Sequence, residues 1–152
     1  MSQTDRLRRA FEIGKHSLTL AGREIVEEDG YVVERLRFVT AEGEAVRGLL
    51  TRPVQTGRWP GLLYIHAHGA RYDIGADELL DGRPALLGPL GPEFARRGFV
   101  TLMIEMPAFG TRALPNESAR SKACLWRGRS LAGQMMGEQQ SAFEWLAARE
   151  DV

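Results

Sequence analysis

Two apolar runs separated by a short helical segment constrain the fold of this chain most. Residues 61–69 (GLLYIHAHG) and 99–106 (FVTLMIEM) are almost continuously apolar, which is typical of strands covered on both faces. Between them lies the segment 91–98 (GPEFARRG), with Pro92 suited to the first turn of a helix and Gly98 suited to its C-terminal cap. Strand, helix and strand in this order predict a right-handed parallel βαβ unit, and therefore an α/β fold.

Alternating strands precede this unit and a long helix follows it. Residues 31–40 (YVVERLRFVT) alternate between apolar and polar, and a glycine-containing turn leads into a second short strand that Pro53 ends, so an antiparallel hairpin is expected. Residues 107–129 read as a long loop, and residues 130–150 as the longest helix. The core side of that helix is predicted to contain Leu131, Met135, Met136, Ala142, Phe143 and Leu146.

The N-terminal segment differs in character from the rest. Residues 4–15 predict a short amphipathic helix, with Leu7, Ala10 and Phe11 on one stripe. We therefore divide the chain into an N-terminal helix and linker, residues 1–24, and a partial α/β domain, residues 25–152.

Composition excludes several classes of function. Lys plus Arg and Asp plus Glu each number 20, so the net charge favours neither nucleic acid nor an anionic membrane as a partner. No apolar run approaches the roughly 20 residues that cross a bilayer. Cys124 is the single cysteine and the N-terminus lacks the apolar core of a signal peptide, which predicts a cytoplasmic protein. No phosphate-binding glycine motif follows a strand, so no cofactor is predicted.

The stretch YIHAHGARYD, residues 64–73, contains two of the three histidines and turns from apolar to polar within a few residues. It fits a metal site, an oxyanion loop or an ordinary strand end. His66 and His68 are two residues apart, so on a strand they share one face and could both bind zinc, with Asp73 and Glu105 completing the shell. A metallohydrolase needs more imidazoles than this, so a metal-dependent hydrolase is kept as an alternative and no metal is predicted.

Taken together, these segments resemble a known family. HAHGA (66–70), EMPAFGTR (105–112) and a closing helix that ends at Asp151-Val152 resemble the N-terminal part of an α/β-hydrolase of the dienelactone hydrolase and acetyl-xylan-esterase-like kind. The resemblance covers roughly residues 25–152. It implies the first half of an α/β-hydrolase sheet, ending before the nucleophile elbow. Glu105 departs from the pattern, because relatives often have Asp after the fourth strand.

The resemblance implies a hydrolase of carboxylic esters or lactones that uses a Ser-His-acid mechanism, with a small-molecule substrate. No G-x-S-x-G occurs in the chain, so no catalytic residue is identified and the chain alone is expected to be inactive. In relatives with one HG, the next residue supplies a backbone N–H to the oxyanion hole, and that residue is Ala70 here. The expected walls of the substrate pocket are His68, Gly69, Arg71, Tyr72 and Trp126.

Two further expectations follow from the missing motif. A non-catalytic α/β binding domain is the other alternative, because no nucleophile with its base is visible. In the family's sheet the strand at 61–69 pairs on both sides, so here one apolar edge would be open. We therefore expect self-association, or a second chain that completes the sheet at this edge.

Overall fold

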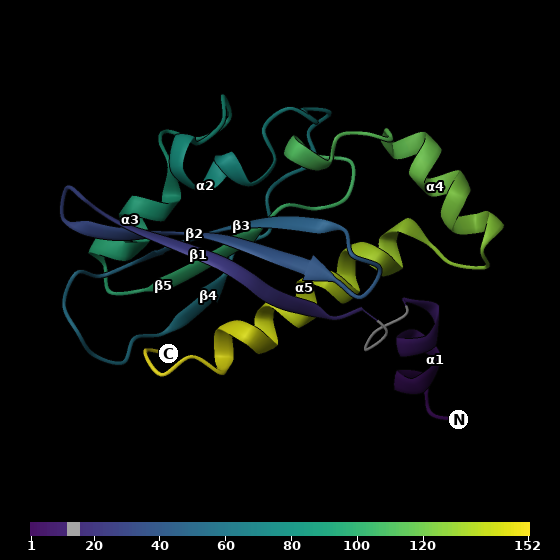
Figure 1. Ribbon diagram of the computed structural model, residues 1–152, viewed down its shortest axis with the longest axis horizontal. Coiled ribbons are helices and arrows are strands. Elements are labelled where there is room, and N and C mark those ends of the chain that lie inside the picture. Colours follow the sequence, from purple (N-terminus) through teal and green to yellow (C-terminus); the bar gives the residue numbers. More distant parts are fainter. Residues whose placement is uncertain (12–15) are drawn as a thin grey trace.

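The computed structural model describes residues 1–11 and 16–152, in which a five-stranded mixed sheet carries helices on both faces (Figure 1). The sheet order is β1-β2-β3-β5-β4; β4 and β5 are parallel, and the other neighbours are antiparallel. This arrangement confirms the predicted α/β class and the parallel pairing of the two apolar runs. The strands are β1 (Leu18–Glu28), β2 (Tyr31–Thr40), β3 (Ala45–Arg52), β4 (Gly61–Leu63) and β5 (Val100–Ile104).

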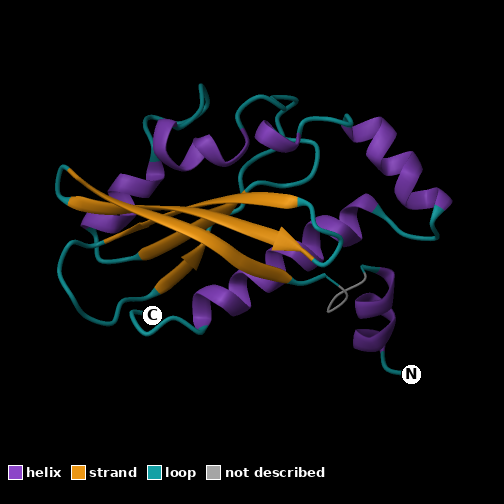
Figure 2. Cartoon of the chain, in the orientation of Figure 1, coloured by secondary structure: helices purple, strands orange, loops and turns teal. Residues whose placement is uncertain are grey.

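The helices divide between the two faces of the sheet (Figure 2). The long helix α5 runs along one face, α2 and α3 lie on the other, and α4 stands beyond the end of the sheet (Figure 1). No helix in the described part of the chain is both long and apolar enough to cross a bilayer. The helices are α1 (Gln3–Ala10), η1 (Gly75–Asp77), α2 (Glu78–Asp81), α3 (Leu90–Arg96), η2 (Gly110–Arg112), α4 (Glu117–Trp126) and α5 (Leu131–Ala147).

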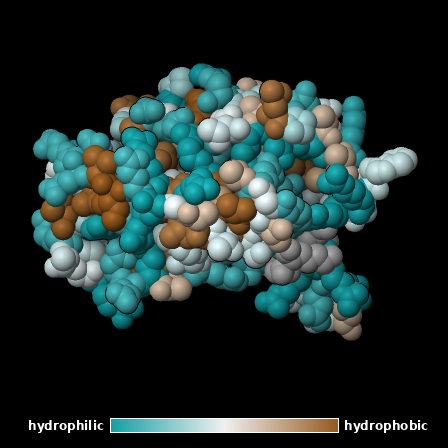
Figure 3. Space-filling model, in the orientation of Figure 1, coloured by the Kyte–Doolittle hydropathy of each residue, from teal (hydrophilic) through white to brown (hydrophobic). Residues whose placement is uncertain are grey.

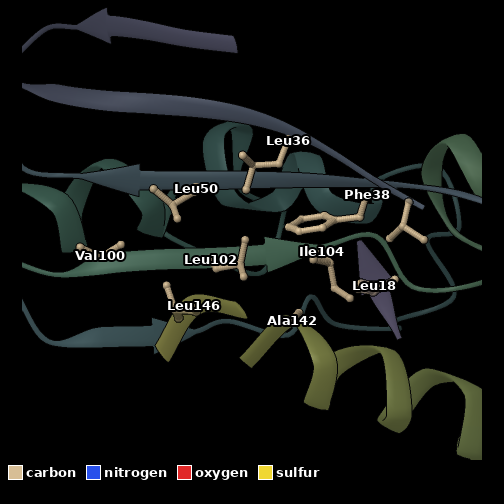
Figure 4. Packing of buried hydrophobic residues seen from close by; sticks show 10 residues of the cluster. Leu18, Leu36, Phe38, Leu50, Val100, Leu102, Ile104, Ala142 and Leu146 are labelled. Carbon is tan, nitrogen blue, oxygen red and sulfur yellow. The ribbon is translucent and has the colours of Figure 1, made fainter. Parts of the chain in front are cut away.

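Strand β5 lies at the centre of the core, and all five of its residues are buried. Its even-numbered residues Leu102 and Ile104 pack with Leu146 of α5 (Figure 4), whereas Met103 packs with Leu79 on the opposite face. Both faces of this strand are therefore covered, as its continuous apolar sequence predicts. The outer surface seen in Figure 3 is mainly hydrophilic, with small separate apolar patches.

The predicted hairpin is confirmed as β2 and β3, whose register places Leu36 opposite Gly48 and Phe38 opposite Val46. Strand β1 adds to it on the outer side, from Leu18 to Glu28. It begins inside the segment that the sequence suggested to be a linker. Its register with β2 shifts between Leu20 and Gly22. Most of its side chains are not buried, and its sequence accordingly alternates only weakly between apolar and polar residues. The predicted helix over residues 4–15 corresponds to α1, and residues 12–15 lie outside the described part of the chain.

Three predictions about local structure are wrong. The strand expected over residues 61–69 ends at Leu63, and Ile65 is half-exposed. The expected loop over residues 107–129 contains η2 and the ten-residue helix α4. On α5, Met136 and Phe143 are exposed, because Gly133, Gly137, Glu138 and Gln139 occupy its buried side with Leu131, Ala142 and Leu146.

Candidate functional site

The carboxyl ends of β4 and β5 lie side by side at one edge of the sheet, which is where open α/β sheets bind ligands. The segments that follow them, residues 64–74 and residues 105–116, are bonded to each other. The Gly110 N–H donates to the Tyr72 carbonyl at 2.7 Å, and the Met106 N–H donates to Nε2 of His66 at 3.2 Å. These two segments, called the β4 loop and the β5 loop below, form the candidate site.

Glu78 at the start of α2 explains why the apolar run leaves the sheet so early. Its buried carboxylate accepts from the Tyr64 hydroxyl at 2.6 Å and from the Ala67 N–H at 3.1 Å, and it pairs with Arg83 at 2.9 Å. Burial and the bond to Glu78 raise the pKa of Tyr64 to about 12, so the phenol remains a donor. The Tyr64 N–H still donates to the Leu102 carbonyl of β5 at 2.8 Å, and the chain leaves the sheet after this residue towards α2, so β4 has only three residues.

A tight turn follows, and its backbone is strained. The Arg71 N–H donates to the His68 carbonyl at 3.0 Å, and the two central residues both have positive φ, 48° at Gly69 and 54° at Ala70. Glycine adopts this region freely, but a residue with a Cβ pays roughly 1–2 kcal/mol. Of the residues that the structure describes, only Ala70 and Ala108 (φ 75°) are non-glycine residues with positive φ. One lies in each loop, and strain of this kind gathers at functional sites.

The β5 loop is anchored from below by Glu105, which is fully buried. Its carboxylate accepts from Arg47 at 2.9 Å, from the Ala76 N–H at 3.2 Å and from the Thr111 N–H at 2.9 Å, and also from the Thr111 hydroxyl. A Cβ at Gly110 would overlap this carboxylate, so glycine is required there. Glu105, which stands where relatives often have Asp, therefore ties β3, η1 and η2 together.

A second buried ion cluster holds the same loop against α5. Arg112 is almost fully buried and pairs with Glu138 at 2.6 Å and with Glu44 at 2.8 Å, while it donates to the Glu105 carbonyl at 3.0 Å. Burial alone raises the pKa of Glu44, but hydrogen bonds from Arg112 and Arg120 outweigh it and lower this pKa to about 2. The loop is thus fixed at both ends by charged groups.

Aromatic rings join the two loops above these anchors. The buried Phe109 ring contacts His66, His68 and Tyr72, with ring centroids 4.8, 5.2 and 5.1 Å away. Burial lowers the pKa of His66, so its ring stays neutral and its Nε2 accepts the Met106 bond. Glu117, the first residue of α4, accepts from the Tyr72 hydroxyl at 2.6 Å and lies 3.1 Å from Nε2 of His68.

The exposed amide of Ala70 sits at the tip of the turn, and its N–H points to Nδ1 of His68 at 3.2 Å. Beside this turn is an open pocket of about 370 Å³. Chemically, the site offers a backbone donor held by a strained turn and a pocket wall with one carboxylate and one phenol. The pocket is lined by Tyr72, Ala108, Ala113, Asn116, Glu117 and Ser118.

Five of the six predicted site residues are consecutive in the chain, and of these five Tyr72 lines the pocket of about 370 Å³. His68, Gly69, Ala70, Arg71 and Tyr72 share the β4 loop, although Arg71 turns to solvent and pairs with its neighbour Asp73 at 2.7 Å. The prediction that Trp126 lines the pocket is not supported by its position. It ends α4 with 92% of its surface exposed, because this helix buries none of its residues.

The residues considered for a metal shell do not converge. His66 is bonded to Met106, His68 faces Glu117, Asp73 pairs with Arg71, and Glu105 is enclosed by its own donors. Within residues 1–11 and 16–152, no group of three or more His, Cys, Asp or Glu side chains could hold a metal ion.

Phe109 and Glu117 were missed as site residues. Phe109 lies in a run of small residues with no periodicity, and only the fold shows that it meets His68. Glu117 had a detectable signal, since Asn116 before it caps α4 by accepting from the Ala119 N–H at 3.0 Å. Recognising this N-cap would have predicted the helix and placed Glu117 in its first turn.

A larger cavity, of about 690 Å³, opens elsewhere, beside Trp59, Trp145 and the buried Glu34. Its charged side chains satisfy one another: Glu34 bonds Arg52 at 2.8 Å and Arg149 at 3.0 Å. It is separate from both strained loops, so we do not assign the site there.

Comparison with known proteins supports the fold. No protein-family profile matches the chain. It is 32% identical over 130 residues to the Bacillus subtilis (strain 168) protein named "Putative hydrolase YtaP", a match that spans 84% of this chain and 44% of YtaP. The chain is also similar to a Bacteroides fragilis structure described as a "putative acetyl xylan esterase", with a TM-score of 0.72, 16% identity, 97% of this chain covered and 42% of that one.

An acetyl xylan esterase from Paenibacillus sp. R4 gives a TM-score of 0.62 at 16% identity, with 97% of this chain and 46% of the esterase covered. At such low identity these structures establish the fold alone. The chain therefore spans less than half the length of the proteins it matches, and over that span it has their α/β fold.

Proposed function

We propose that this chain supplies the oxyanion donor and part of the pocket wall of a hydrolase that cleaves carboxylic esters or lactones. The observation that carries the proposal is the strained turn at Ala70, at the carboxyl end of β4 and beside the β5 loop. Support comes from the fold shared with acetyl xylan esterases and from the 32% identity to YtaP.

The proposed chemistry is acyl transfer from a serine nucleophile that a His–acid pair activates. The tetrahedral intermediate carries an oxyanion, which must meet fixed N–H donors. In hydrolases of this fold, one donor follows the nucleophile and the other comes from the loop after a neighbouring strand. Ala70 takes the second role, which is worth about 2.7–4 kcal/mol of transition-state stabilisation.

The remaining residues of the β4 loop shape the pocket in this proposal. Tyr72 supplies one wall and is backed by the buried Phe109 ring that stacks on it, and His68 braces the turn through its bond to the Ala70 N–H. Gly69 permits the turn, and Arg71 pairs with Asp73 outside the pocket lining. The open pocket of about 370 Å³ would admit a small acyl or alcohol group rather than a long chain.

The nucleophile, base and acid are assigned to a part of the protein outside these residues. The chain contains no G-x-S-x-G, and its relatives extend well beyond the matched part. It would therefore be inactive by itself, and no step of the proposed reaction is assigned to a side chain of residues 1–152.

A chimera tests the proposal, in which this chain replaces the matching part of YtaP. It should hydrolyse p-nitrophenyl acetate and incorporate one equivalent of a fluorophosphonate probe at a serine of the YtaP-derived part, and the 152-residue chain alone should do neither. YtaP itself is the positive control. A chimera that folds but reacts with neither reagent while YtaP reacts with both would contradict the proposal, as would labelling of the isolated chain.

A further inference from the structure

The Ala70 N–H, to which the proposed function assigns the oxyanion, already has an acceptor in this structure. It donates to Nδ1 of His68 at 3.2 Å, and Nε2 of the same ring lies 3.1 and 3.2 Å from the two carboxylate oxygens of Glu117. A neutral imidazole carries one hydrogen, so these partners are all satisfied by a single tautomer. In it, Nδ1 is the bare acceptor and Nε2–H is the donor.

Glu117 is itself held in place. The Tyr72 hydroxyl donates to it at 2.6 Å, and the Asn116 cap fixes the first turn of α4, from which its side chain projects. The hydrogen bonds from Tyr72 and His68 lower the pKa of Glu117, so it remains a carboxylate that only accepts. A carboxylate opposite Nε2 selects the Nε2–H tautomer, in the way that second partners orient imidazoles elsewhere.

We propose that Glu117 is a positioning residue for the Ala70 amide: it fixes the His68 tautomer, and His68 then holds the Ala70 N–H until an oxyanion takes it. This inference rests on the proposed function, because only there is the Ala70 N–H a catalytic donor. Glu117 touches neither the substrate nor the reacting atoms in this role, and acts through His68.

The arrangement favours the transition state over the bound ester. A neutral ester carbonyl would exchange one neutral hydrogen bond for another of similar strength, and so gains little. An oxyanion accepts a charge-assisted bond, which is roughly twice as strong. The exchange therefore becomes favourable only as charge develops, and binding energy of that kind accelerates the chemical step.

The proposal also links the Ala70 amide to the protonation state of His68. The ionisable groups that face the ring are Glu117 on α4 and Tyr72 on its own loop, and the β5 loop presents the apolar ring of Phe109. The Arg83 guanidinium lies against the neighbouring Gly69. A protonated His68 carries hydrogen on Nδ1 and cannot accept, so protonation releases the Ala70 N–H while the contact with Glu117 is kept.

Nitrogen NMR on the 152-residue chain tests this without any substrate. Labelling with ¹⁵N-histidine and ¹⁵N-alanine gives three imidazoles to assign, and His68→Gln identifies one of them. In the wild type, Nδ1 of His68 should resonate as an unprotonated nitrogen and Nε2 as a protonated one. When the ring is protonated, the Ala70 amide signal should change together with the His68 ring signals.

Variants separate the positioning role from a merely structural one. In Glu117→Ala, the two ring nitrogens should move towards a tautomer average, and solvent exchange of the Ala70 amide should rise about two- to tenfold, as for one exposed hydrogen bond. Glu117→Gln should restore the tautomer, because its amide oxygen also accepts. Asp73→Ala is the matched control, since this exposed carboxylate of the same loop pairs with Arg71, and it should change neither signal.

A protonated Nδ1 in the neutral wild-type ring, or unchanged His68 and Ala70 signals in Glu117→Ala, would overturn the inference. These readouts are independent of catalysis. If the YtaP chimera is inactive but the His68 and Ala70 signals respond to Glu117→Ala as expected, the proposed function is wrong and the positioning geometry stands. If the chimera is active but these signals do not respond, only the role of Glu117 is wrong.

Discussion

Replacing Glu105 tests whether its carboxylate supports both loops of the candidate site. Glu105→Ala removes the acceptor of the buried Ala76 N–H, and such a donor left without a partner costs about 1–3 kcal/mol. The Thr111 N–H also loses its acceptor, but Thr111 is exposed, so water can replace part of that bond. The Arg47 side chain retains 28% exposure, so water can replace part of its lost bond and its contribution is smaller. We expect a loss of about 3–5 kcal/mol in the free energy of unfolding, in the range for breaking a buried ion pair.

Urea unfolding followed by the fluorescence of the three tryptophans measures this loss. Total stabilities of single domains are about 5–15 kcal/mol, so the effect is large enough to resolve. Glu93→Ala is the control, because Glu93 is half-exposed and its pair with Arg97 lies on the surface of α3. That variant should lose at most about 1 kcal/mol. If Glu105→Ala proves no more destabilising than Glu93→Ala, the carboxylate does not anchor the loops as described.

Three further results are expected. Acidification from about pH 4.5 to 2 should lower the free energy of unfolding, because the pKa of Glu44 falls from 4.5 to about 2 on folding and its carboxylate stabilises only while it is ionised. Glu44→Gln should flatten this part of the pH profile of stability. An unchanged profile in this variant would argue against the ion cluster. The protein should retain no zinc after dialysis. If it retains an equimolar amount, and His68→Ala loses that zinc, the metallohydrolase alternative would be favoured. The chain should self-associate at micromolar concentration through the open side of β4, and Leu62→Lys should weaken this in sedimentation experiments; a monomeric wild type would contradict it.

Periodicity predicted the parts of the fold in which burial follows the sequence pattern. Strand β2 alternates between buried and exposed residues from Glu34 to Phe38, and β5 is buried on both faces, so these two patterns report their environment directly. Strand β1 and helix α4 were not predicted from the sequence, because they bury few side chains or none and therefore lack an apolar stripe. The strand predicted at β4 is too long for the opposite reason: the run is apolar, but the chain leaves the sheet after Tyr64 and the Ala67 N–H bonds Glu78 instead of a strand.

The candidate site was predictable only in its position along the chain. The HG dipeptide at the end of an apolar run indicated the turn, and the structure places His68 and Ala70 there with positive φ at Ala70. The buried charged residues that hold the β5 loop, Glu105 and Arg112, could not be foreseen, because charged side chains usually lie on the surface. Their oppositely charged partners lie 26 to 68 positions away in sequence, and no local pattern contains such pairs.

The claim that Ala70 is the oxyanion donor is tested most directly by removing its N–H alone. Lactic acid in place of Ala70 in the YtaP chimera exchanges this N–H for an ester oxygen and keeps the methyl group, and glycolic acid in place of Gly69 makes the same exchange one residue earlier. We predict that kcat for p-nitrophenyl acetate falls about 10²–10³-fold for the substitution at Ala70 with KM little changed, and that the substitution at Gly69 has a small effect. An unchanged kcat after the substitution at Ala70, or an equal loss from both, would contradict the assignment.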